Sequence, residues 1–488
     1  NSDGFNILCY TFNVTQDTTN DKYVFRYDHQ LVKDTSLGSH KLEFVFSKVK
    51  TRTFPDVTTN GIDAPFPGGV HGFQASSRNL ITPALVSTFG SNVTNTVRYG
   101  RQWAPVDFNR DSMPTAPFFG LSGVLTNYDN TFMPQPRNTT VNQITDNLSW
   151  VKGNHLWKFG ADWQRMESVN HFRFPGDKVF YVFDFNPSSR TYQPFVYEQY
   201  DDAPSTSKGD QLAVYARDRF QLGARVSVEA GVRLEHQTGT SDIGAGTVDA
   251  WVFAPRVSGS VSLTSDSKTI LVGSFGRFHD SILQGFSDAF ASVPQQTNYN
   301  SYEWDGSQYV FSYRNEQGGN TFMPNLAVTP RYMDEMTGGF ERQVNNSLGF
   351  GVRVISRTWK NFIDDVRSFE PDGTITRVVQ NIADGSRTYR GLELSFDKRF
   401  SNNWSLSGSY TYSKTRGNHF GDDFTALDDF VDATCQQSVD PGLGDAEGKF
   451  PCASIQSRLS GTPAYDRPHL AKFAGAYRHP IGRVDLTA

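Results

Sequence analysis

Residues 388–414 constrain the fold most, because apolar and polar side chains alternate there with a period of two. Leu392, Leu394 and Phe396 fall on one side of the stretch, and charged or hydroxyl residues fall on the other. A period of two over this length predicts strand rather than helix. Residues 401–403, Ser-Asn-Asn, interrupt the alternation and predict a hairpin turn.

The length of this hairpin favours a membrane environment. Each arm has about ten residues or more, close to the ~9–11 that cross a bilayer at a tilt and longer than the ~5–6 of most globular strands. Phe400 and Trp404 lie beside the turn, and Tyr410 and Tyr412 lie far from it. Aromatic residues at both ends of an apolar band are typical of membrane interfaces.

Composition excludes several other classes of protein. The 488 residues are 37% hydrophobic and 14% aromatic, with a formal net charge of −5. No run of ~18–20 apolar residues occurs, which excludes a helical membrane protein. A membrane β-barrel tolerates low hydropathy because half of each strand faces water. The near-neutral charge argues against a nucleic-acid partner.

The remaining strand signals come in pairs joined by short turns, and long loops connect the pairs. The expected strands are residues 6–15, 22–31, 40–50, 140–150, 156–165, 210–221, 225–236, 251–263, 268–278, 331–342, 347–357, the two arms of 388–414, 466–478 and 483 onward. Residues 51–138, rich in Pro, Gly and Asn, are expected to be one long irregular stretch.

The other expected long loops carry a few local signals. They are residues 168–209, 279–330, 358–387 and 415–465, with a helix-like segment at 280–292 and a small hairpin turn at 372–373. Strict alternation of short turns and long loops predicts an all-β, transmembrane, antiparallel up-and-down barrel. Its short turns would face the periplasm, its long loops would be extracellular, and closure would be required because lipid does not tolerate an open edge.

Six segments in sequence resemble the barrel of TonB-dependent outer-membrane receptors. The similarity is greatest to the Oar-like branch, which carries a carboxypeptidase-regulatory-like domain. The segments are NQITDNLSWVKGNHLWKFGADWQR (142–165), QLAVYARDRFQLGARVSVEAGVRLEHQ (211–237), FAPRVSGSVSLTSDSKTILVGSFGRFHD (253–280), NLAVTPRYMDEMTGGFERQVNNSLGFGVRVISR (325–357), YRGLELSFDKRFSNNWSLSGSYTYSK (389–414) and DRPHLAKFAGAYRHPIG (466–482).

The resemblance implies that residues 1–488 are an incomplete portion of a barrel of about 22 strands. The plug domain, the TonB box, the signal peptide and the C-terminal strands of such receptors have no match in this chain. It further implies energised uptake of a bulky, scarce nutrient across the Gram-negative outer membrane. The expected partners are outer-membrane lipid, an extracellular ligand of unknown identity, and the TonB complex through regions missing from this chain.

Two other functions remain open at this stage. A surface structural or adhesion barrel would use the long loops to hold partners, and a passive porin-like channel would lack a plug. A plug upstream would favour energised uptake, whereas a closed barrel without one would favour the channel.

The chain carries no sequence motif of an enzyme. HExxH, Walker-type, GxSxG and CxxC patterns are absent, so we expect no catalytic residues, no cofactor and no metal. An acidic loop could hold calcium, but a solvated loop is favoured because Gly-punctuated ligand spacing is missing. Its carboxylates are Asp422, Asp423, Asp428, Asp429 and Asp432.

The aromatic residues at 171–200 are the candidate ligand-binding residues. Phe180, Tyr181 and Phe183 could stack on a sugar, a peptide or a siderophore. Packing of one loop on another at the barrel mouth is an equally good explanation, because large apolar loops must bury some surface.

The charged residues of the strands are expected to face a water-filled lumen and to pair across neighbouring strands. A direct role in the substrate path is the less favoured alternative. These residues are Arg225, Glu229, Arg233, Glu235, Glu393, Asp397 and Arg399.

The three cysteines give little further constraint. Cys435 and Cys452 share one loop rich in Gly and Asp, where a disulfide would fit an oxidising compartment and two unpaired thiols are the alternative. Cys9 lies in an apolar strand signal with no evident partner.

Overall fold

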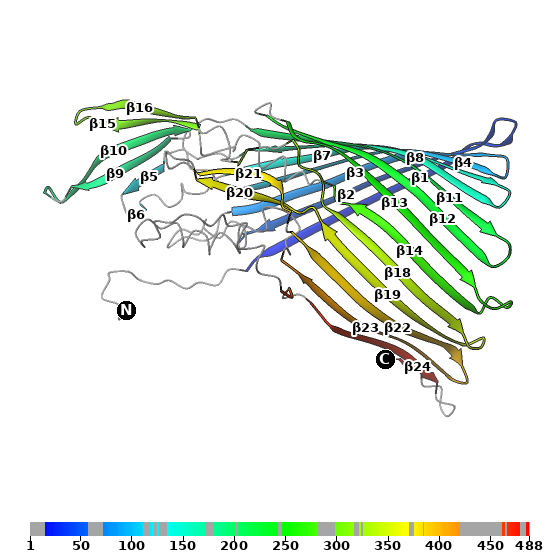
Figure 1. Ribbon diagram of the computed structural model, residues 1–488. Helices are drawn as coiled ribbons and strands as arrows, with labels where there is room; N and C mark the ends of the chain where they lie inside the picture. Colours follow the sequence, from blue (N-terminus) through cyan, green and yellow to red (C-terminus); the bar gives the residue numbers. More distant parts are fainter. Residues whose placement is uncertain are drawn as a thin grey trace.

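The fold was determined as a computed structural model, which describes the strands and most of the turns between them. The residues described are 15–56, 72–110, 118–121, 124–125, 134–171, 179–186, 188–200, 204–242, 246–281, 298–316, 322–323, 326–369, 375–383, 385–418, 461–463, 466–478 and 485–487. Within these ranges the chain forms strands and no helix, and the main element is one curved antiparallel sheet of 16 strands (Figure 1).

Each strand of this sheet pairs with the next strand of the sheet along the chain. In spatial order the strands are β1 (Asp17–Thr35), β2 (Gly38–Phe54), β3 (Gly72–Phe89), β4 (Val93–Arg110), β7 (Gln135–Lys152), β8 (His155–Asn170), β11 (Ser205–Leu222), β12 (Val226–Ser241), β13 (Gly246–Ser262), β14 (Thr269–His279), β18 (Tyr332–Gln343), β19 (Leu348–Lys360), β22 (Arg387–Ser401), β23 (Trp404–Gly417), β24 (His469–Arg478) and β25 (Asp485–Thr487). This order is the predicted up-and-down topology.

Short turns gather at one end of the sheet, and the connections at the other end are long except for residues 242–245 between β12 and β13 (Figure 1). The turn between β22 and β23 shows how the sequence sets a tight reversal. Asn402 and Asn403 both adopt positive φ, 54° and 66°. This is the conformation of a type I′ turn, whose twist matches the flanking strands and which asparagine tolerates better than most residues.

The two faces of the sheet differ in chemistry. Val214, Leu234 and Phe253 lie in one register row across β11, β12 and β13, and their side chains are 49%, 41% and 53% exposed. The adjacent row, on the opposite face, contains Glu235 and Val252, which are buried. The apolar exposed face is therefore the lipid side, and the other face lines the lumen.

Aromatic residues bound the apolar band on the outer face. Trp150 and Trp157 are register partners near the short turns, and Trp163 lies further along β8 on the same face. Beyond Trp163, Arg165 donates from Nε to Asp210 Oδ1 at 2.8 Å, again on this face. An aromatic boundary followed by a charged pair marks the edge of the hydrocarbon region.

The prediction for residues 51–138 is wrong, and the expected loops 168–209 and 279–330 also contain strands that were not predicted. Residues 51–138, expected to be irregular, contain β3 and β4, each 18 residues long. Pro83 and Pro105 made these segments look unlike strands in the sequence, because proline lacks the backbone N–H that donates to a β-ladder. Both are accommodated in the ladder, Pro83 opposite Phe44 and Pro105 opposite Asn138.

The long connections fold into two further sheets. Six strands from three loops join in the order β16-β15-β10-β9-β5-β6, hereafter the loop sheet, and three more form β17-β21-β20. Their bounds are β5 (Phe118–Leu121), β6 (Val124–Leu125), β9 (Val179–Asn186), β10 (Thr191–Tyr200), β15 (Asn298–Trp304), β16 (Tyr309–Glu316), β17 (Phe322–Met323), β20 (Ile363–Phe369) and β21 (Ile375–Asn381). The loop sheet extends beyond the loop end of the barrel (Figure 1).

The hairpin expected around residues 372–373 is confirmed, since β20 and β21 pair across that position. The expected strand at residues 6–15 and the helix-like segment at 280–292 lie almost wholly outside the described residues.

Candidate functional site

The lumen face carries the charged residues that the alternation predicts, and most of them pair. Arg217 Nη1 on β11 lies 2.8 Å from Glu229 Oε1 on β12, which is a pair across neighbouring strands as predicted. Arg233 Nε lies 3.0 Å from Glu235 Oε2 within β12, so this pair does not cross between strands. On β19 and β22, Arg353 Nη1 lies 3.8 Å from Glu393 Oε2. The Glu235 side chain is only 9% exposed, so its pairing with Arg233 offsets part of the cost of removing that charge from water.

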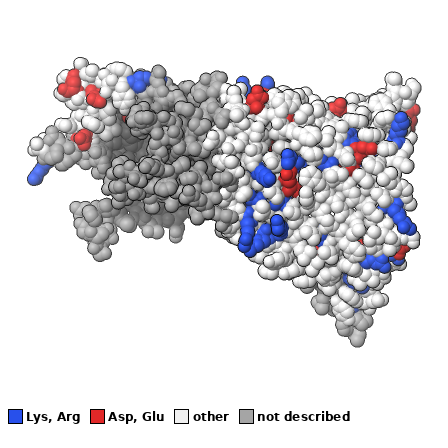
Figure 2. Space-filling model, viewed as in Figure 1, with Lys and Arg blue, Asp and Glu red and all other residues white. Residues whose placement is uncertain are grey.

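The other predicted lumen residues lie toward the short turns. Asp397 and Arg399 line a recess of about 460 Å³ near the β18–β19 turn. Arg225 immediately precedes β12, where its carbonyl accepts a hydrogen bond of 2.8 Å from Ser262 N. Basic and acidic side chains lie near one another on the visible face of the barrel, with wide uncharged areas between them (Figure 2).

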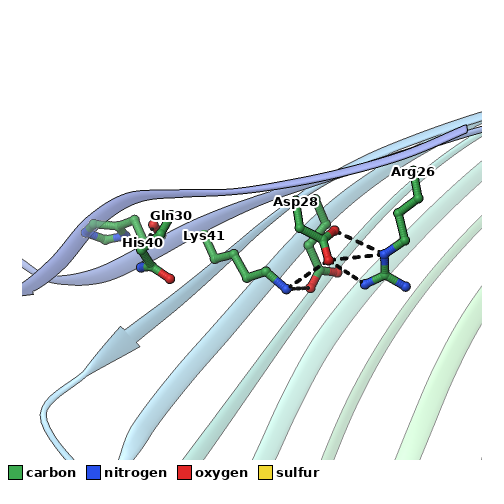
Figure 3. Close-up of polar contacts among 6 residues, drawn as sticks. Arg26, Asp28, Gln30, His40 and Lys41 are labelled. Atoms are coloured by element: carbon green, nitrogen blue, oxygen red, sulfur yellow. Dashed lines mark hydrogen bonds and ion pairs between the residues drawn. The ribbon is translucent and has the colours of Figure 1, made fainter.

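A four-residue charge network connects β1 and β2 on the lumen face. Arg26 donates to Asp28, with Nη2 2.9 Å from Oδ2, and Lys41 Nζ lies 3.4 Å from the same oxygen (Figure 3). Lys41 Nζ also lies 2.9 Å from Glu43 Oε1. Two cations and two carboxylates therefore balance one another in this network.

A row of four glutamines crosses the wall closer to the loops. Gln143, Gln164, Gln211 and Gln237 occupy one register row across β7, β8, β11 and β12. Gln143 Nε2 donates to Asp162 Oδ2 at 2.9 Å, and Gln237 is buried. We did not predict this row from the sequence, although a glutamine recurs on the polar side of the four segments and could have indicated it.

Aromatic rings cover the loop sheet. Tyr197 on β10 stacks on Tyr302 of β15 at 4.4 Å between ring centroids, and Tyr309 of β16 meets Tyr197 edge-on at 4.9 Å. Burial raises the pKa of Tyr197 and of Tyr309. Strands from separate loops are thus held together by aromatic contacts as well as by the ladder.

The predicted binding residues Phe180, Tyr181 and Phe183 all lie on β9, the strand next to β10. Tyr181 contacts Tyr197 at 5.3 Å and Tyr309 at 5.9 Å between ring centroids. The backbone of Phe180 and of Phe183 pairs with both β5 and β10. The structure therefore brings Tyr181 into packing between loops, which is the alternative to ligand binding, and it tests neither explanation.

A second tyrosine pair lies further along the same strands. The hydrogen bond between the Tyr299 and Tyr313 hydroxyls, 3.3 Å apart, together with burial, raises the pKa of Tyr299 to about 12. Burial and a hydrogen bond to Glu198 raise the pKa of Tyr200. These phenols therefore remain protonated over the physiological range.

Several predicted features lie outside the described residues. They are Cys9, Cys435, Cys452 and the acidic loop from Asp422 to Asp432. Where the structure does describe the chain, three or more His, Cys, Asp or Glu side chains nowhere gather in a way that could hold a metal. The described ranges also contain no helix long and apolar enough to cross a membrane.

Comparison with known proteins agrees with this geometry. The outer membrane beta barrel domain family matches residues 1–247 and 239–486 of the chain. No curated protein sequence matches it.

Solved structures show the same fold. The FrpB iron transporter of Neisseria meningitidis (F5-1 variant) superposes with a TM-score of 0.56 at 10% identity, covering 96% of this chain and 58% of its own. BauA, the ferric preacinetobactin receptor of Acinetobacter baumannii, superposes with a TM-score of 0.53 at 11% identity. The match covers 97% of this chain and 60% of BauA. The ferric citrate transporter FecA superposes with a TM-score of 0.53 at 12% identity, and the match covers 95% of this chain and 56% of FecA. The chain thus spans less than two thirds of the length of these proteins.

The long antiparallel strands, the lipid-facing apolar rows and the polar lumen define a transmembrane β-barrel. The chain belongs to the outer membrane beta barrel domain family, and its location is the Gram-negative outer membrane.

Proposed function

We propose that this chain is the barrel portion of a TonB-dependent receptor that takes up a bulky, scarce nutrient with energy from the inner membrane. The proposal is supported by two features that occur together: the barrel has a polar lumen, and a folded loop sheet lies at one end of that lumen. A surface that recognises a ligand outside and a water-lined path beneath it are the two parts that uptake through a barrel requires.

The structural neighbours support the class of function and leave the nutrient open. Their names describe receptors and transporters of iron or ferric chelates. At 10–12% identity the likeness extends to the fold and not to the ligand. We further propose, on the sequence resemblance, that the protein is of the Oar-like branch and has no catalytic activity.

We place the plug domain, the TonB box, the signal peptide and the C-terminal strands outside residues 1–488. The coverage of 56–60% of the neighbours' own lengths supports this proposal. Ligand contact is assigned to Phe180, Tyr181 and Phe183 on β9, because this strand lies within the aromatic surface of the loop sheet.

Depletion of nutrients from culture medium tests the proposal for a ligand of any chemistry. Cells with and without the full-length protein are grown in host strains that have or lack TonB, and the spent media are compared by mass spectrometry. We expect at least one solute to be depleted only when both proteins are present. Depletion that is independent of TonB would indicate a passive channel. Unchanged media together with loss of cell adhesion would indicate an adhesion barrel.

A further inference from the structure

A recess on the lumen wall concentrates positive charge. It has a volume of about 430 Å³ and spans β11 to β14 and β18. Its lining includes Arg217, Arg233, Arg256 and Phe278, together with two carboxylates, Glu229 and Glu335. Three guanidinium groups thus lie around one concave surface that opens toward the lumen.

Two of the three guanidinium groups have carboxylate partners. Arg217 pairs with Glu229 at 2.8 Å, and Arg233 pairs with Glu235 at 3.0 Å. Arg256 has no carboxylate within ion-pair distance among the residues that the structure describes. Among the described residues, the recess therefore holds one guanidinium without a carboxylate partner, unlike the balanced network of Arg26, Asp28, Lys41 and Glu43 on β1 and β2.

Glycines on both sides of Arg256 let the Arg217 and Phe278 side chains lie close over the sheet beside it. Gly231 on β12 and Gly276 on β14 are its direct register partners. A Cβ on Gly231 would lie 2.5 Å from Arg217 Cβ, and a Cβ on Gly276 would lie 2.9 Å from the Phe278 ring. Any larger residue at either position would displace the side chains that form the recess.

Phe278 holds the free guanidinium in place. Arg256 Cζ lies 4.3 Å from the centroid of the Phe278 ring. A ring under the guanidinium plane fixes its orientation by cation–π attraction and leaves its N–H groups free to donate at the edge. A planar fork of donors matches a carboxylate or a phosphate, which it can bind with two parallel hydrogen bonds.

We propose that Arg256 is the centre of an anion-binding station on the lumen wall, which takes the carboxylate or phosphate group of a solute in transit. The assignment of a solute in transit rests on the uptake function proposed above. The anion-binding chemistry of the station is independent of that function, because it follows from the Arg256 guanidinium without a carboxylate partner, the two glycines and the phenylalanine. The transported nutrient is accordingly an anion or carries an anionic group.

Calorimetric titration of the purified full-length protein with inorganic phosphate, and separately with citrate, tests the station. Arg256→Gln should weaken binding of both anions by about tenfold or more, because charge-assisted hydrogen bonds are lost. Glu229→Gln should strengthen binding, because it frees Arg217 beside Arg256. Arg165→Gln is the matched control, since it removes the same charge from the outer face, and it should bind both anions as the wild type does.

Two results would overturn the station: equal affinity of the wild type and Arg256→Gln for phosphate, or no binding of either anion by the wild type in the millimolar range. Heat-modifiable migration of each variant in gels establishes that the barrel is folded before titration. Anion binding is measured without transport. A protein that binds phosphate through Arg256 but depletes no solute from the medium would refute the proposed uptake and leave the station intact.

Discussion

Tyr215 on β11 donates its hydroxyl to Asn147 Oδ1 on β7 at 2.6 Å, although β8 lies between the two strands. The ring reaches across the position of Gly160 on β8, where any Cβ would overlap it. Asn147, Gly160 and Tyr215 occupy one register row on the lumen face. An aromatic ring that covers a glycine on the next strand is a recurrent way to pin the register of a sheet.

Replacement of Gly160 should therefore destabilise the barrel. Gly160→Ala is expected to cost about 1–3 kcal/mol of unfolding free energy, because the new methyl group displaces the Tyr215 ring and breaks its hydrogen bond. Gly338→Ala is the matched control, since no atom lies within 4 Å of the added Cβ. Urea unfolding in lipid vesicles, followed by tryptophan fluorescence, measures both, and equal stability of the two variants would contradict this role of Tyr215.

The tyrosines of the loop sheet predict a loss of stability at high pH. The pKa of Tyr299 is raised to about 12, from a usual value near 10. Between these values the unfolded state has lost a proton that the folded state keeps, so the stability of the loop sheet falls as pH rises through this window. Below the usual tyrosine pKa near 10, Tyr299 is protonated in both states, and its contribution to the stability of the loop sheet is fully present.

Absorbance of tyrosinate, recorded together with near-ultraviolet circular dichroism, measures this loss. Tyr299→Phe should flatten the decline between the two pH values, because the residue no longer titrates. Tyr23→Phe, on the outer face of β1, is the control and should leave the decline in circular dichroism unchanged, because β1 is not part of the loop sheet. Identical profiles for the wild type and Tyr299→Phe would contradict the raised pKa.

Asn361 should hold two loops together at the barrel mouth. Its Nδ2 donates to Thr329 Oγ1 at 2.7 Å and to Pro330 O at 3.1 Å, while its backbone adopts a φ of 65°. Asn361→Gly keeps the backbone conformation and loses the hydrogen bonds, whereas Asn361→Ala loses both.

Hydrogen exchange separates these two effects. Exchange at Thr329, whose amide donates to Asn381 Oδ1 at 2.9 Å, should accelerate in both variants and more strongly in Asn361→Ala. The expected difference between them is about 1 kcal/mol, the usual cost of a left-handed conformation for alanine. Unchanged protection in both variants would show that Asn361 does not join the loops.

The sequence predicts the barrel strands well where one face is continuously apolar. Leu392 and Leu394 alternate with Glu393, and β22 has the predicted boundaries within a residue or two. Asn402 and Asn403 likewise set their own turn by local chemistry. Period and turn residues are properties of a short segment, so they can be read from that segment alone.

Other parts of the fold depend on contacts between distant segments. The loop sheet joins β5, β9 and β15, whose pairing is not encoded in any one of them. Pro83 gives β3 a local signal for a loop, and the pairing with β2 and β4 overrides it. The free charge of Arg256 is also invisible in the sequence, because it depends on which carboxylates the register brings near.

The central claim, a bilayer-spanning barrel with a water-lined lumen, is tested most directly along β22. Single cysteines replace Leu392, Glu393 and Leu394 in turn, and each is exposed to a lipid-soluble and a water-soluble thiol reagent in intact outer membranes. Leu392 is 37% exposed and Leu394 is 41% exposed on the outer face, whereas Glu393 lies opposite Arg353 on the lumen face. We predict lipid-reagent labelling at 392 and 394 and water-reagent labelling at 393. The reverse pattern, or no alternation at all, would contradict the account.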